Sequence, residues 1–108
     1  MQGKSIEYYI TEAGQAPFLD WFDKLPHQEQ YIVRKYLLRI ADGGSKKSLK
    51  SLKGGVFEIR IFHGSGLRVY FAEDGEKIIL LLLGGNKRSQ KSDIGKARKY
   101  WSEYAKTK

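Results

Sequence analysis

The sequence predicts an α+β domain in which two N-terminal helices pack on a mainly antiparallel β-sheet and a C-terminal helix follows. Strand patterns between residues 56 and 83 are joined by short turns, whereas helical patterns lie in separate runs before and after them. Hydrophobic residues make up 41% of the chain, enough for a core. The 108 residues fit one domain, 1–108, with the element order β-α-α-β-β-β-α.

The first 44 residues contain one strand pattern and two helix patterns. In "SIEYYI", 5–10, an apolar set (Ile6, Tyr8, Ile10) alternates with Glu7 and Tyr9, which indicates a strand. "QAPFLDWFDKL", 15–25, places aromatic residues at helical spacing behind Pro17. The clearest helix pattern runs over 26–44, where Pro26 opens an apolar stripe and two glycines end it.

The remaining residues predict a basic loop, three strands and a last helix. Lysines recur through 45–55, which favours a loop. Strand patterns cover 56–62, 66–72 and 76–83, and "EDG" between the last two is typical of a hairpin turn. The third is apolar throughout, which predicts burial on both faces. A helix is expected from about 90 to 104, with an apolar stripe of Ile94, Ala97, Trp101 and Tyr104.

The positive charge gathers in two segments. The net charge is +8; residues 43–71 hold six basic residues against one acidic, and residues 87–108 hold eight against two. This asymmetry favours a polyanionic partner such as nucleic acid. The alternative is that a basic surface only aids solubility.

Composition excludes several classes of site. The chain has no cysteine, which rules out disulfides, iron–sulfur clusters and cysteine zinc sites, and two histidines are too few for a histidine-rich metal site. The start of the sequence turns polar at once, so we expect no signal peptide. The longest apolar run, 78–83, is far shorter than the ~20 residues that span a bilayer. We therefore expect a cytoplasmic protein without a membrane partner.

One arginine lies in each of the first two strands of the predicted hairpin. If the core faces match, Ile61 pairs with Leu67, and Arg60 then lies directly opposite Arg68, with Glu58 opposite Tyr70. This register needs a three-residue loop, 63–65. Facing like charges cost stability, so we expect either arginine-to-alanine change to leave stability unchanged or to raise it slightly.

The arginine pair has a functional and a structural interpretation. Glu58 could neutralise one guanidinium, or the pair could bind an anion, because a guanidinium matches phosphate geometry. Alternatively, both arginines only occupy a solvated face. Other basic features favour the anion: Lys50 and Lys53 lead into the first strand, and Lys87, Arg88 and Lys91 surround the start of the last helix. Tyr70 could stack on a base. Together they predict an RNA-binding cleft.

Four sequence pieces carry a family resemblance. In order they are "GVFEIRI", "GSGLRVYF", the apolar strand ending "GGNK", and "SQKSDIGKA", within residues 54–104. Together with "FLDWFDKLP" they resemble the RelE/ParE superfamily of toxins from type II toxin–antitoxin systems. The similarity is greatest to the HigB-like branch, the addiction-module killer proteins, and covers nearly the whole chain.

The resemblance implies a RelE-like fold and an mRNA endoribonuclease, or mRNA interferase, that inhibits translation on the ribosome. It implies cleavage without metal or cofactor, by attack of the ribose 2′-OH on the adjacent phosphate. It also implies a cognate antitoxin, usually a helix-turn-helix protein. By position, Arg68 matches the arginine that contacts the scissile phosphate, while Arg60 and Lys87 match neighbouring basic residues.

The general base stays open among several residues. Glu58 shares the arginine face, but two guanidinium groups beside it would make it a weaker base. Asp93 lies at the end of the expected cleft, and Lys50 or Lys53 could serve only when neutral. Two other functions remain: a non-enzymatic DNA gyrase inhibitor of the ParE type, and a nucleic-acid-binding accessory protein without toxicity. The arginine face favours the nuclease, because gyrase inhibition needs no phosphate-centred constellation.

Overall fold

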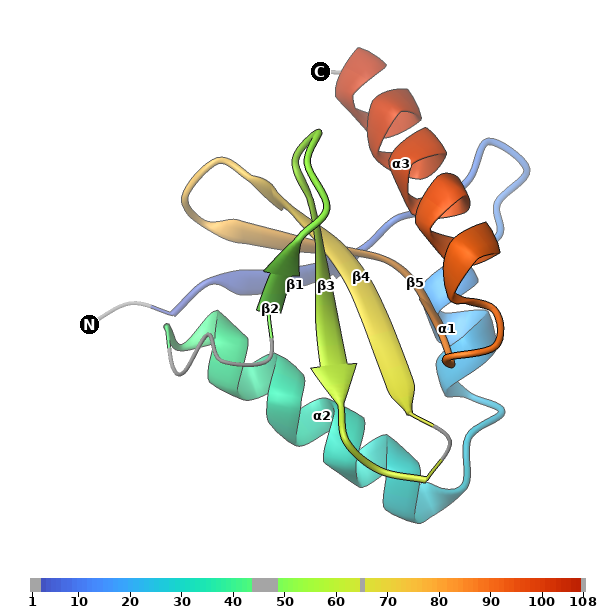
Figure 1. Ribbon diagram of the computed structural model, residues 1–108. Coiled ribbons are helices and arrows are strands. Elements are labelled where there is room, and N and C mark those ends of the chain that lie inside the picture. Colours follow the sequence, from blue (N-terminus) through green and yellow to red (C-terminus); the bar gives the residue numbers. More distant parts are fainter. Residues whose placement is uncertain (1–2, 44–48, 65, 108) are drawn as a thin grey trace.

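The computed structural model describes residues 3–43, 49–64 and 66–107 (Figure 1). Their elements follow the predicted order with one additional strand. The helices and strands are β1 (Ser5–Tyr8), α1 (Pro17–Phe22), α2 (His27–Ala41), β2 (Leu49–Ser51), β3 (Val56–Ile61), β4 (Leu67–Asp74), β5 (Ile78–Gly85) and α3 (Gln90–Lys106). The predicted α+β class is therefore confirmed.

The strands form one five-stranded sheet in the order β1-β5-β4-β3-β2. Its pairs are antiparallel except β1 with β5, which is parallel, so the sheet is mainly antiparallel as predicted. The basic segment 45–55 was expected to be a loop, and this was wrong for Leu49–Ser51, which pairs with β3 as an edge strand. Residues 45–48 of that segment, and position 65 of the predicted hairpin loop, lie outside the described residues.

The helices cover both faces of the sheet. One core cluster joins α1 and α2 to the sheet through Phe18, Val33 and Leu37. The other cluster lies on the opposite face, where Ala97 of α3 is buried and Trp101 packs against the strands. Strand β5 contributes Ile79 and Leu81 to the first cluster and Leu80 and Leu82 to the second. Its predicted burial on both faces is confirmed.

The N-terminal strand buries a different residue from the one its pattern suggests. β1 ends at Tyr8, which is 43% exposed, and Ile10 beyond it is 53% exposed. Tyr9 follows the strand and is only 5% exposed. Its backbone N–H still donates to Leu81 O at 2.9 Å, but its side chain belongs to the α3 side of the molecule.

Two consecutive glycines at the end of β5 let a helix approach each face of the sheet. A Cβ at Gly84 would lie 2.0 Å from Cε3 of Trp21, on α1. A Cβ at Gly85 would lie 1.9 Å from Oδ2 of Asp93, on α3. Because successive strand residues point to opposite faces, the pair creates room on both sides at once.

Candidate functional site

The arginine pair has the predicted register. Arg60 pairs with Arg68 and Glu58 with Tyr70 across the β3–β4 ladder. Each pair extends across a neighbouring strand into a row of side chains on one face. Arg68 also pairs with Gly85 of β5, and Glu58 also pairs with Lys50 of β2. Both rows lie on the face that α3 covers, since Tyr70 belongs to the α3-side core.

Glu58 connects the two guanidinium groups. Its side chain is fully buried. Oε1 accepts a hydrogen bond from Nε of Arg60 at 3.2 Å, and Oε2 lies 3.6 Å from Nε of Arg68. A third contact comes from α3, where Nε2 of Gln90 donates to Oε2 at 2.8 Å. The carboxylate thus screens two like charges that the register forces together.

Arg68 and Tyr70 lie mostly inside the protein. Arg68 is 8% exposed, and its Nη1 donates to the Gly66 carbonyl at 3.2 Å. Tyr70 is fully buried, although base stacking had been predicted for its ring. Within the described part of the chain, Nε of Arg68 has no hydrogen-bond partner and is 3.6 Å from Oε2 of Glu58. Burial, followed by the neighbouring Glu58 carboxylate, raises the pKa of Tyr70, so its hydroxyl stays protonated.

A polar turn brings the start of α3 onto this face. Oδ1 of Asn86 accepts hydrogen bonds from the backbone N–H groups of Arg88 at 2.9 Å and Ser89 at 3.1 Å. The Ser89 hydroxyl donates to Oδ2 of Asp93 at 2.5 Å. Asp93 is 6% exposed. Its carboxylate therefore faces away from solvent and accepts the Ser89 hydroxyl at the start of α3.

The solvent-facing part of the site consists of basic side chains. The side chain of Arg60 is 40% exposed. Lys87 is exposed, and its Cβ would lie 3.8 Å from a Cβ placed on Gly66, the residue that accepts from Arg68. This places Lys87 beside the Arg68 guanidinium. The other predicted RNA-binding residues, Lys50, Lys53, Arg88 and Lys91, are all exposed.

The structure thus brings Glu58, Arg60, Arg68, Tyr70 and Lys87 together, with Asp93 behind Gly85. The sequence pattern predicts Ser89 or Ser92 as the cap of the last helix, and Ser89 is the residue at the start of α3, although its side chain makes no capping hydrogen bond. Gln90, in the "SQ" of the last quoted piece, has a contact that the sequence does not predict. The Gln90–Glu58 contact could not be predicted from the sequence, because it depends on where α3 packs against the sheet. The Ser89–Asp93 contact is local, since the two residues are four positions apart.

Residues 20–101 match the family described as phage-derived protein Gp49-like (DUF891). The chain belongs to this family. Membership in this family is compatible with a toxin of a toxin–antitoxin system, as the sequence resemblance implies. The match covers the end of α1, all of α2 and the arginine-bearing strands β3 and β4.

A protein of Haemophilus influenzae (strain Rd), described only as uncharacterized, is 32% identical over 81 residues. The alignment covers 75% of this chain and 82% of that protein. In the present chain, none of the described helices is long and apolar enough to cross a membrane.

Proposed function

We propose that this protein is the toxin of a type II toxin–antitoxin system and acts as an mRNA endoribonuclease on the translating ribosome. The Gp49-like family is compatible with the toxin role. Family membership alone does not separate a nuclease from a gyrase inhibitor, so the nuclease assignment rests on the arginine face.

The observation that carries the proposal is the cation cluster around Arg68. Two guanidinium groups face each other across β3 and β4, and the exposed Lys87 side chain begins close to Gly66, which also borders the Arg68 guanidinium. An arrangement of like charges is unfavourable unless an anion balances it. Buried Glu58 supplies only one negative charge. A phosphodiester at the exposed edge, beside Arg60 and Lys87, would offset a further positive charge.

The proposed reaction needs little covalent chemistry from the protein. The ribose 2′-oxygen forms a bond to the adjacent phosphorus while the bond from phosphorus to the 5′-oxygen breaks. A base takes the 2′-OH proton, and an acid returns a proton to the departing 5′-oxygen. The products are a 2′,3′-cyclic phosphate and a 5′-OH, and the cations stabilise the extra charge of the phosphorane.

The burial pattern narrows the choice of base. Glu58 is fully buried and held by three side chains, so we assign it to positioning the arginines. Asp93 is buried and bonded to Ser89. Lys87 and Lys50 are exposed and therefore reachable by substrate, which makes them the better candidates for proton transfer or phosphate contact. We further propose a cognate antitoxin, of the helix-turn-helix class that the resemblance implies.

Controlled expression in a host without the cognate antitoxin tests the proposal. We expect growth arrest, with new RNA 5′ ends inside translated codons. Lys87→Ala should suppress both effects, whereas Lys77→Ala, on the exposed β4–β5 turn, should leave both unchanged. Growth arrest with intact mRNA and an SOS response would instead indicate gyrase inhibition. A folded protein without any growth effect would contradict both toxin functions.

A further inference from the structure

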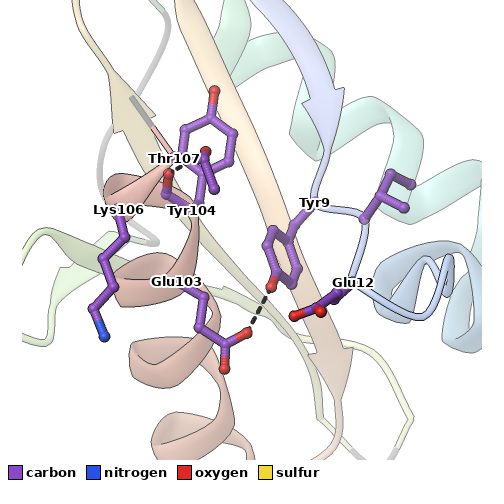
Figure 2. A pocket seen from close by; sticks show the side chains of 7 residues that line it. Tyr9, Glu12, Glu103, Tyr104, Lys106 and Thr107 are labelled. Carbon is purple, nitrogen blue, oxygen red and sulfur yellow. Dashed lines mark hydrogen bonds between the residues drawn. The ribbon is translucent and has the colours of Figure 1, made fainter.

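A second site of opposite charge lies at the C-terminal end of α3. A hollow of about 540 Å³ opens there between the last turns of the helix and the segment that follows β1 (Figure 2). From Gln90 to Glu103 the helix rises roughly 20 Å, so this hollow is remote from the arginine pair. Its lining residues are Tyr9, Ile10, Glu12, Glu103, Tyr104, Lys106 and Thr107.

An aromatic side chain flanked by carboxylates forms the floor of this hollow. The Tyr9 hydroxyl donates to Oε2 of Glu103 at 3.0 Å, and the Tyr9 ring stacks on Tyr100 with centroids 5.1 Å apart. Figure 2 shows the Glu12 carboxylate beside the same hydroxyl. Burial, the hydrogen bond to Glu103 and the charge of Glu12 raise the pKa of Tyr9 to about 12. The hydroxyl is therefore a neutral donor.

The two carboxylates have no cationic partner in the described part of the chain. No ion pair joins Glu12 or Glu103 to a described lysine or arginine, although Lys106 lines the same hollow. The last turn of α3 adds the negative end of the helix dipole. This acidic hollow is unusual in a chain of net charge +8.

We propose that this hollow binds an organic cation, a guanidinium or ammonium group on a short apolar stem. Carboxylates pair with the charged head, while aromatic rings attract cations through their faces and cover an apolar stem. The volume lies within the range of small-ligand pockets. A metal ion fits less well, since no group of three or more His, Asp or Glu in the described residues is placed to hold one. This site is independent of the proposed nuclease function.

The cation can come from a free polyamine or from an arginine or lysine side chain of another protein chain. Titration of isotope-labelled protein, followed by two-dimensional NMR, distinguishes these sources. The probes are agmatine, a short acetylated peptide with one arginine, and the same peptide with neutral citrulline. We expect agmatine and the arginine peptide to shift Tyr9, Ile10 and Thr107 resonances saturably. Tighter binding of the peptide indicates a protein source, and tighter binding of agmatine a free amine.

Variants at the carboxylates provide the decisive comparison. Glu103→Gln and Glu12→Gln should each weaken agmatine binding roughly threefold or more, the loss expected for one partly exposed charge pair. The double variant should lose saturable binding, whereas Glu76→Gln, on the exposed β4–β5 turn, should keep it. Equal binding of the citrulline peptide, or unchanged binding in the double variant, would overturn the proposal, as would no saturable shift with either cation.

Discussion

Glu58 determines whether the facing arginines destabilise the fold by repulsion or are held together through a shared carboxylate. It lies between them with no exposed surface, and Gln90 fixes its Oε2 from the other side. From the sequence alone, the two arginines repel each other, and replacing one with alanine would leave stability unchanged or raise it. With the carboxylate buried, loss of a guanidinium instead leaves a charge with fewer partners, and this cost is the larger of the two.

The two arginines should therefore differ in their effect on stability. Arg68→Ala should lower the free energy of unfolding by about 1–3 kcal/mol, because a nearly buried ion pair and the Gly66 contact are lost. Arg60→Ala should cost less than about 1 kcal/mol, since that side chain is 40% exposed. Urea unfolding of both variants measures this difference. An unchanged or higher stability for Arg68→Ala would restore the repulsive interpretation.

At the residue scale, the sequence predicts which residues pair across the strands but not how deeply each side chain is buried. Strand alternation and the apolar pattern suffice to place Arg60 opposite Arg68 and Glu58 opposite Tyr70. The burial of Glu58 and Tyr70 depends on the α3 side chains that cover them. Single-strand patterns contain no information on that covering.

At the scale of elements, the Gly84-Gly85 pair is the contact point of two helices with β5. The apolar run before it predicts a buried strand, and its end at two glycines indicates a break. In the structure the strand instead continues through both glycines. The two glycines let α1 and α3 pack close to β5, since Trp21 and Asp93 occupy the positions where their side chains would lie.

Alanine substitutions separate packing from helix propensity. Gly84→Ala should destabilise the protein by about 1–3 kcal/mol, because the added methyl overlaps the Trp21 ring. Gly95→Ala, inside α3 with nothing within 4 Å of the added atom, should stabilise it by about 0.5–1 kcal/mol. Thermal unfolding of both variants tests this. Equal effects would show that close approach at Gly84 is unimportant.

Strand β2 shows where local pattern fails. Leu49–Ser51 is three residues long, follows lysines and has no periodicity to detect. It becomes a strand because the exposed edge of β3 offers backbone hydrogen bonds to the returning chain. Its consequence for the site is to place Lys50 opposite Glu58.

At the scale of the whole molecule, α3 joins two electrostatically opposite regions. Its first turn faces the arginines through Gln90, and its last turns approach Tyr9 through Glu103. The sequence predicts this helix and its apolar stripe but not its two polar ends, because each contact crosses more than 30 residues.

Alkaline pH should weaken the fold through Tyr9. Its pKa is 10.0 in the unfolded reference and about 12 in the folded protein, because burial and the Glu103 hydrogen bond disfavour the phenolate. Between these values the unfolded state binds fewer protons, so stability falls as pH rises from about 10 to 12. Below pH 10 this contribution is complete. Tyr9→Phe should reduce the slope of unfolding free energy against pH; an unchanged slope would contradict this assignment.

The end chemistry of cleaved mRNA tests the central claim most directly. Purified protein is added to translating ribosomes with labelled message, and the fragments are analysed at both new ends. We predict cuts within codons that leave a 2′,3′-cyclic phosphate and a 5′-OH, slowed roughly tenfold or more by Lys87→Ala but not by Lys77→Ala. Intact message in the presence of folded protein, or equal cutting by the Lys87 variant, would contradict a nuclease centred on the arginine face.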